Sequence, residues 1–354
     1  MKYFKILVVI VFLSSCEEYF RPDIDVASPM YVFDGLMTDQ PGPYRVKIMK
    51  TFGYDGKTEN VTNAKVRIEC SDGSTYRLTC DTSGCYLTDS ATCVGKVGKS
   101  YKLIAVFPDG QQFESTSEEM LPCPDIDEVN GFYYENKEIV TNGREYFNIV
   151  ESGICATSTT SAAGFTPYYR YDCKIVLQTN QFYPGLFPAN RYIYRPLVPE
   201  GLLIIADARN YADNKITGNQ IYKTSKKIML TGIDSLVEDM TYFDIINYGE
   251  FVLVKQFSMN ESQYNFWKAV KDQQENKSYF FGQIENQPVG NVFSSKGVKT
   301  LGYFCVSAVK QNFGALGLKE SNKYVRKYDS YTFPDTDTMA YYELPQNYTI
   351  MFDN

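Results

Sequence analysis

The sequence predicts a mainly β protein: an N-terminal β-sandwich of the immunoglobulin-like kind, followed by a larger β-rich domain with one prominent helix. Aromatic residues are abundant, with 30 Tyr and 23 Phe, and together with β-branched residues they favour half-buried pleated surfaces. Short segments alternate apolar and polar residues between Gly, Pro and Asp turns. Helical periodicity stands out only near residues 259–275.

The N-terminal sandwich is predicted over residues 30–121. Residues 64–70 and 75–80 alternate around the turn at residues 71–73, which indicates a hairpin. Similar strand patterns occur at residues 30–37, 44–48, 85–88, 101–107 and 111–116. Short antiparallel strands in such succession are typical of a small sandwich.

The second domain is predicted over residues 125–354, because Pro122 and Pro124 interrupt regular structure just before it. Residues 169–177 have the pattern of a strand with one solvated face. Three further segments are more continuously apolar, as strands covered on both faces are. We expect them to form the central sheet of this domain: residues 201–206, 251–257 and 301–309.

The helix is predicted from a capping-box spacing, in which Ser258 is followed by Glu261. Apolar residues then recur at near-helical intervals through Gln274. We expect the helix to pack against the second sheet, with the sole tryptophan, Trp267, in the core and not on a ligand-stacking platform.

Charge and composition exclude several functions. The chain carries 35 basic and 42 acidic side chains, a formal charge of -7, so nucleic acid is not an expected partner. It contains no histidine, which removes Ser-His-Asp and Cys-His catalysis and histidine metal ligands. Four oxygen-bearing residues lack the spacing of an EF-hand, so we predict a polar loop and no metal or cofactor: Asp207, Asn210, Asp213 and Asn214.

The N-terminus has the three parts of an export signal. Lys2 and Lys5 precede an apolar stretch at residues 6–13 that is too short to span a bilayer. Small residues then lead to Cys16 in a pattern that resembles the bacterial lipobox. Residues 1–15 are therefore predicted to be a signal peptide and Cys16 the lipid anchor of a tether at residues 16–29. Glu17 and Glu18 resemble a surface-export signal, although they also suit a solvated tether.

The other cysteines suggest disulfides, because an even number in an exported chain is typical of a disulfide framework. A zinc site is the weaker alternative, since the chain lacks a tight CxxC pair and histidine. Sequence alone does not choose the pairing, although strand register argues against Cys70 with Cys80. We expect the four within residues 30–121 to pair among themselves. The candidates are Cys70, Cys80, Cys85, Cys93, Cys123, Cys155, Cys173 and Cys305.

Residues 165–195 are the best candidate for a binding loop. Aromatic residues stand there among Pro184, Gly185 and Pro188, where an extended loop could present rings to a sugar, a peptide or a partner protein. The alternative, equally weighted, is that the loop packs over the second sheet. The aromatic residues are Phe182, Tyr183, Phe187, Tyr192 and Tyr194.

Several motifs resemble a Bacteroidota outer-membrane lipoprotein family of unknown function, numbered 4249. Besides the lipobox, they are residues 34–36, 41–44, 95–101, 168–170, 254–274, 290–291 and 301–309. The resemblance implies a transthyretin-like sandwich, a larger β-rich domain and frequent association with SusC-like TonB-dependent transporters. It supplies no catalytic residues.

Three function classes remain open at this level. The anchor, the fold and the resemblance favour a non-enzymatic accessory protein at the outer membrane and cell surface, binding a ligand or a transporter in nutrient uptake. A structural subunit of an outer-membrane assembly would instead show a broad apolar interface. A carboxylate-dependent hydrolase would need two acids about 5 to 9 Å apart in a cleft.

Replacing Cys16 by Ala should abolish outer-membrane anchoring, because it removes the thiol that accepts the lipid. Replacing Glu17 and Glu18 by Ala should preserve lipidation. It should also make the protein less accessible to protease added to whole cells. Fractionation and protease shaving measure the two effects. A Cys16→Ala protein that stays membrane-bound after high-salt and carbonate washes contradicts the lipid anchor, and a silent double Glu change contradicts only the surface signal.

Overall fold

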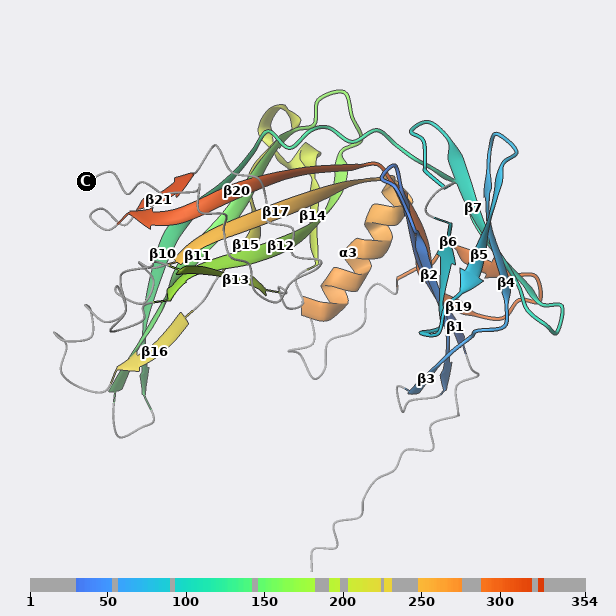
Figure 1. The fold of residues 1–354 in the computed structure, drawn as a ribbon, viewed down its shortest axis with the longest axis horizontal. Helices are drawn as coiled ribbons and strands as arrows, with labels where there is room; N and C mark the ends of the chain where they lie inside the picture. Colours follow the sequence, from blue (N-terminus) through green and yellow to red (C-terminus); the bar gives the residue numbers. More distant parts are fainter. Residues whose placement is uncertain are drawn as a thin grey trace, which may run out of the picture.

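The computed structural model describes ten segments of the chain, and within them the protein is mainly β, as the sequence predicts (Figure 1). The strands form three sheets, and one long helix lies between two of them. No helix in these segments is long and apolar enough to cross a membrane. Cys16, Glu17 and Glu18 lie outside the described segments. The described residues are 30–52, 57–89, 93–141, 146–181, 191–197, 203–223, 226–230, 248–275, 288–319 and 324–327.

The first sheet has eleven strands and holds all the strands predicted at the N-terminal end of the chain. Its main path is β18-β8-β7-β4-β5-β6-β2-β1-β19, with β3 beside β2 and β9 beside β7. The short strands β3 and β9 carry no apolar alternation that predicts them. The bounds are β1 Met30–Thr38, β2 Arg45–Phe52, β3 Lys57–Asn60, β4 Lys65–Cys70, β5 Thr75–Cys80, β6 Cys85–Thr88, β7 Ser100–Val106, β8 Gln112–Ser115, β9 Glu118–Glu119, β18 Val292–Ser294 and β19 Thr300–Ser307.

The structure does not confirm a separate immunoglobulin-like sandwich of two sheets at the N-terminus. Instead, the single sheet curls until strands near its opposite ends face each other. The ring of Phe113 on β8 lies 5.1 Å from that of Tyr31 and 5.2 Å from that of Phe33, both on β1. The strands of a curled sheet alternate apolar and polar residues just as those of a sandwich do, because in both folds one face of each strand points to the core and the other to solvent.

The expectation that residues 301–309 form the central sheet of the second domain is wrong. β19 instead pairs in parallel with β1, in a register that runs from Tyr31 opposite Thr300 to Thr38 opposite Ser307. Ladder pairing switches after Ala308, and the chain continues as β20, which pairs with β17 in another sheet. The apolar run predicted a covered strand, but the covering partner comes from the other end of the chain.

The other two sheets pack face to face. The order of the second is β10-β11-β15 with β16 beside β11, and that of the third is β13-β12-β17-β20-β21 with β14 beside β12. Val129 and Ile216 from one sheet share a buried cluster with Tyr171 and Val254 from the other. The bounds are β10 Glu128–Thr141, β11 Tyr146–Ser161, β12 Tyr168–Gln181, β13 Arg191–Leu197, β14 Ile204–Asp207, β15 Lys215–Lys223, β16 Lys226–Leu230, β17 Tyr248–Met259, β20 Val309–Lys319 and β21 Tyr324–Lys327.

The predicted helix is α3, Glu261–Glu275, and it lies between the third sheet and the first (Figure 1). Its cap differs from the predicted one, because the side chain of Asn260 accepts the hydrogen bond from the backbone N–H of Gln263 at 2.8 Å. Ser258 lies at the end of β17, where its hydroxyl donates to the carbonyl of Leu121 at 2.6 Å. Trp267 is partly buried and packs edge-on against Phe266.

The connector predicted at residues 122–124 is fixed by side-chain amides from the third sheet. Gln256 is buried, and its Nε2 donates to the carbonyl of Pro124 at 3.0 Å. Asn312 on β20 donates in the same way to the carbonyl of Ile126 at 2.8 Å. These bonds replace the ladder that an isolated segment lacks. The division into two domains stays a prediction.

The side chain of Asn291 helps to join the two ends of the curled sheet. Its Oδ1 accepts from the backbone N–H of Phe304 at 2.8 Å, and its Nδ2 donates to the carbonyl of the same residue at 3.0 Å. The amide thus pairs with β19 as a strand residue would. Gly290 permits this approach, because a Cβ there would lie 2.2 Å from the carbonyl oxygen of Gly302.

A buried acid stabilises the same junction. Glu118 is only 4% exposed and its carboxyl group accepts hydrogen bonds from neighbouring segments, as a buried polar group must. Asn291 donates at 3.0 Å and the hydroxyl of Tyr303 at 3.4 Å. Thr116 and Asn260 donate as well. The loop before α3, the segment before β18, and β19 therefore converge on one carboxyl group.

Replacing Asn291 by Ala should lower the free energy of unfolding by about 2–4 kcal/mol, because the backbone of Phe304 and the carboxyl group of Glu118 lose buried partners. Urea unfolding followed by the fluorescence of Trp267 measures this. The matched control is Asn60→Ala, which removes only an exposed bond to the carbonyl of Ser83 and should change stability by less than about 0.5 kcal/mol. Equal losses in both variants contradict the role of Asn291.

Candidate functional site

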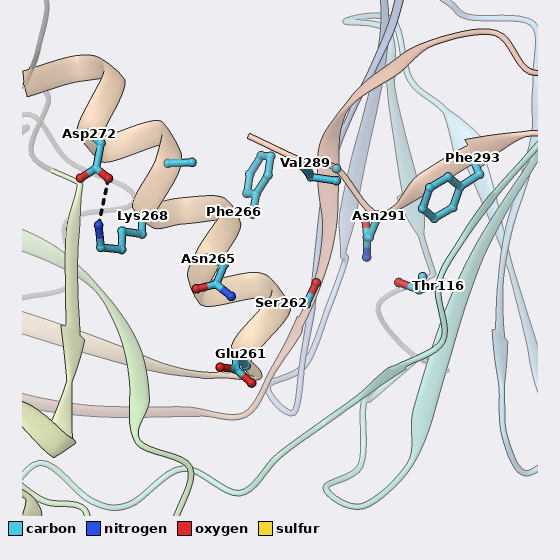
Figure 2. A pocket seen from close by; sticks show the side chains of 12 residues that line it. Thr116, Glu261, Ser262, Asn265, Phe266, Lys268, Asp272, Val289, Asn291 and Phe293 are labelled. Atoms are coloured by element: carbon cyan, nitrogen blue, oxygen red, sulfur yellow. Dashed lines mark hydrogen bonds and ion pairs between the residues drawn. The ribbon is translucent and has the colours of Figure 1, made fainter. Parts of the chain in front are cut away.

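A groove of about 650 Å³ separates α3 from the segment that leads into β18 (Figure 2). Its size is within the range typical of ligand pockets. α3 forms one wall, and residues 289–293 with Thr116 form the other. The sequence did not single out this groove, because its walls lie far apart in the chain and meet only through the junction at Glu118.

The helical wall is polar. Glu261, Asn265, Lys268 and Asp272 recur at helical spacing, so each turn of α3 presents a polar side chain to the groove. Lys268 and Asp272 form an i,i+4 ion pair at 2.9 Å. The hydrogen bond to Asp272 raises the pKa of Lys268 above its usual value. The two side chains of this ion pair therefore lie together on the helical wall of the groove.

The opposite wall is apolar and solvent-exposed. Val289 is 76% exposed and Phe293 58% exposed. Phe266 completes the apolar surface from α3, and Figure 2 shows its ring directed toward Val289. Phe266 itself is buried and packs against Tyr303, with ring centroids 5.0 Å apart. The buried ring of Phe266 thus forms the floor of the groove. The exposed side chains of Val289 and Phe293 form its apolar rim.

The two carboxylates that line this groove lie far apart along α3. Glu261 and Asp272 lie eleven residues apart on one helix, about 16 Å along its axis. Retaining and inverting glycosidases place their carboxylates about 5 to 9 Å apart. Glu261 accepts a hydrogen bond from the hydroxyl of Tyr168 at 3.3 Å, and Tyr168 stacks on Tyr264 at 4.6 Å.

The other face of α3 covers a partly buried cation, Arg170. The guanidinium of Arg170 lies 4.7 Å from the ring centre of Phe257 and 5.0 Å from that of Trp267, so two aromatic faces stabilise its charge. Trp267 is thereby engaged in packing, in agreement with the expectation that it belongs to the core. Burial raises the pKa of the neighbouring Cys305 thiol to about 11.

The predicted aromatic binding loop is replaced in part by a hairpin. Residues 168–181 are strand β12 and residues 191–197 are its partner β13, in which Tyr192 pairs with Asn180 and Tyr194 with Gln178. Phe182, Tyr183 and Phe187 lie outside the described residues. Whether these rings bind a ligand stays a prediction. Phe165, which opens the region, is 42% exposed in the turn before β12.

The polar loop predicted near Asp207 is instead the end of β14 followed by two short 3-10 helices, η2 Ala208–Asn210 and η3 Ala212–Asn214. Both carboxylate oxygens of Asp207 accept hydrogen bonds from Arg209, with Nη2 at 2.7 Å from Oδ2. This contact lowers the pKa of Asp207. Asp213 and Asn214 have positive φ angles of 55° and 52°, a conformation that Asp and Asn tolerate in turns. Across the described part of the chain, no group of three or more acidic or cysteine side chains could hold a metal ion.

Comparison with known proteins identifies one family. A sequence profile described as "Domain of unknown function (DUF4249)" matches residues 17–312, which include both walls of the groove. No curated protein matches the chain. A solved structure described as "Biofilm associated protein - BSP domain" aligns with 84% of this chain at 8% identity and a TM-score of 0.11. The chain spans 60% of that structure's length, and so low a TM-score supports no conclusion about fold or function.

The predicted disulfides are absent among the described residues, where no disulfide joins any of the candidate cysteines. Cys70 and Cys80 lie at opposite ends of the β4–β5 hairpin, whose register pairs Val66 with Leu78, so the argument against their pairing holds. Most of the thiols are buried and fill core positions as small apolar side chains. An even number of cysteines leads to disulfides only where the fold brings two of their side chains within bonding geometry. The cysteines outside any disulfide are Cys70, Cys80, Cys85, Cys93, Cys123, Cys155, Cys173 and Cys305.

Thiol titration of the denatured Cys16→Ala chain should therefore give the same sulfhydryl count before and after reduction, because no disulfide joins its cysteines. In the native protein at pH 8 most should be unreactive, because burial raises the pKa of Cys93, Cys123 and Cys173 to about 11. Only about 0.1% of such a thiol is then the reactive thiolate. A sulfhydryl count that rises after reductant treatment contradicts this and restores the disulfide prediction.

Proposed function

The chain belongs to the DUF4249 family, a domain of unknown function, and from this premise we propose that it is a non-enzymatic accessory protein of the outer membrane that binds a ligand or a transporter through the groove beside α3. The lipid on Cys16 anchors the protein, and Glu17 and Glu18 direct it to the cell surface. A SusC-like TonB-dependent transporter is the proposed partner in nutrient uptake, on the resemblance of the sequence motifs.

The observation that carries the proposal is the exposed apolar rim of the groove. Val289 and Phe293 expose most of their surface beside a concave cavity. Exposed apolar groups that border a polar surface mark interaction sites more often than isolated surface residues do. Covering them would contribute about 25 cal/mol for each Å² of apolar surface removed from water.

The groove favours binding over the two alternatives. A structural subunit would need a broad apolar interface, whereas this surface is narrow and has one polar wall. A hydrolase would need paired carboxylates, and those of the groove are separated along α3. Neither alternative accounts for a groove that has one polar wall and one apolar wall.

Photo-crosslinking tests the proposal. With p-benzoylphenylalanine at position 293, irradiation of intact cells should yield an adduct with an outer-membrane protein or a bound ligand, because Phe293 lies at the rim. The matched control places the same group at position 52, where Phe52 is an exposed aromatic residue that does not line the groove. The absence of any adduct from position 293, or equal adducts from both positions, contradicts a binding role for the groove.

A further inference from the structure

We draw no further inference here: the strongest candidate, the exposed apolar rim of the groove at Val289 and Phe293, belongs to the site already described, and nothing in the structure shows what covers it.

Discussion

The buried carboxyl group of Glu118 is the constraint on which the arrangement of the molecule depends. A buried acid is costly unless its oxygens accept hydrogen bonds. Thr116 donates from its own segment, and Asn260, Asn291 and Tyr303 donate from three other segments. Displacing any one of these segments removes a buried hydrogen bond, so the curled sheet, the start of α3 and β19 are held in one geometry.

The groove is a consequence of that geometry. Asn260 both donates to Glu118 and caps α3 through the N–H of Gln263, so the helix begins at a fixed point. Asn291 holds the opposite wall against β19. The two walls are thus positioned by bonds at their base, while their upper surfaces remain free. Such preorganisation lowers the entropic cost of binding.

Much of the fold was predictable, because strands and helices have local signatures. The alternation at β4 and β5 and the periodicity of α3 depend only on neighbouring residues. The sequence predicted Ser258 as the helix cap, whereas the observed cap is Asn260. The error is only two residues, because both residue types cap helices and local spacing does not decide between them. The thiols were misjudged for a different reason, because a count of cysteines carries no information on whether their side chains meet.

The sequence by itself determined the mainly β class, the positions of many strands, the helix at residues 261–275 and the chemistry that the lack of histidine excludes. Only the tertiary structure decided which strands pair, because the apolar run of β19 has the same pattern beside β1 as it would beside β17. It also decided the groove, whose walls at Asn265 and Phe293 meet through the folded junction. The local sequence pattern indicates whether each residue is buried. A site between distant segments depends instead on which segments are joined by buried hydrogen bonds, and the local pattern does not contain that information.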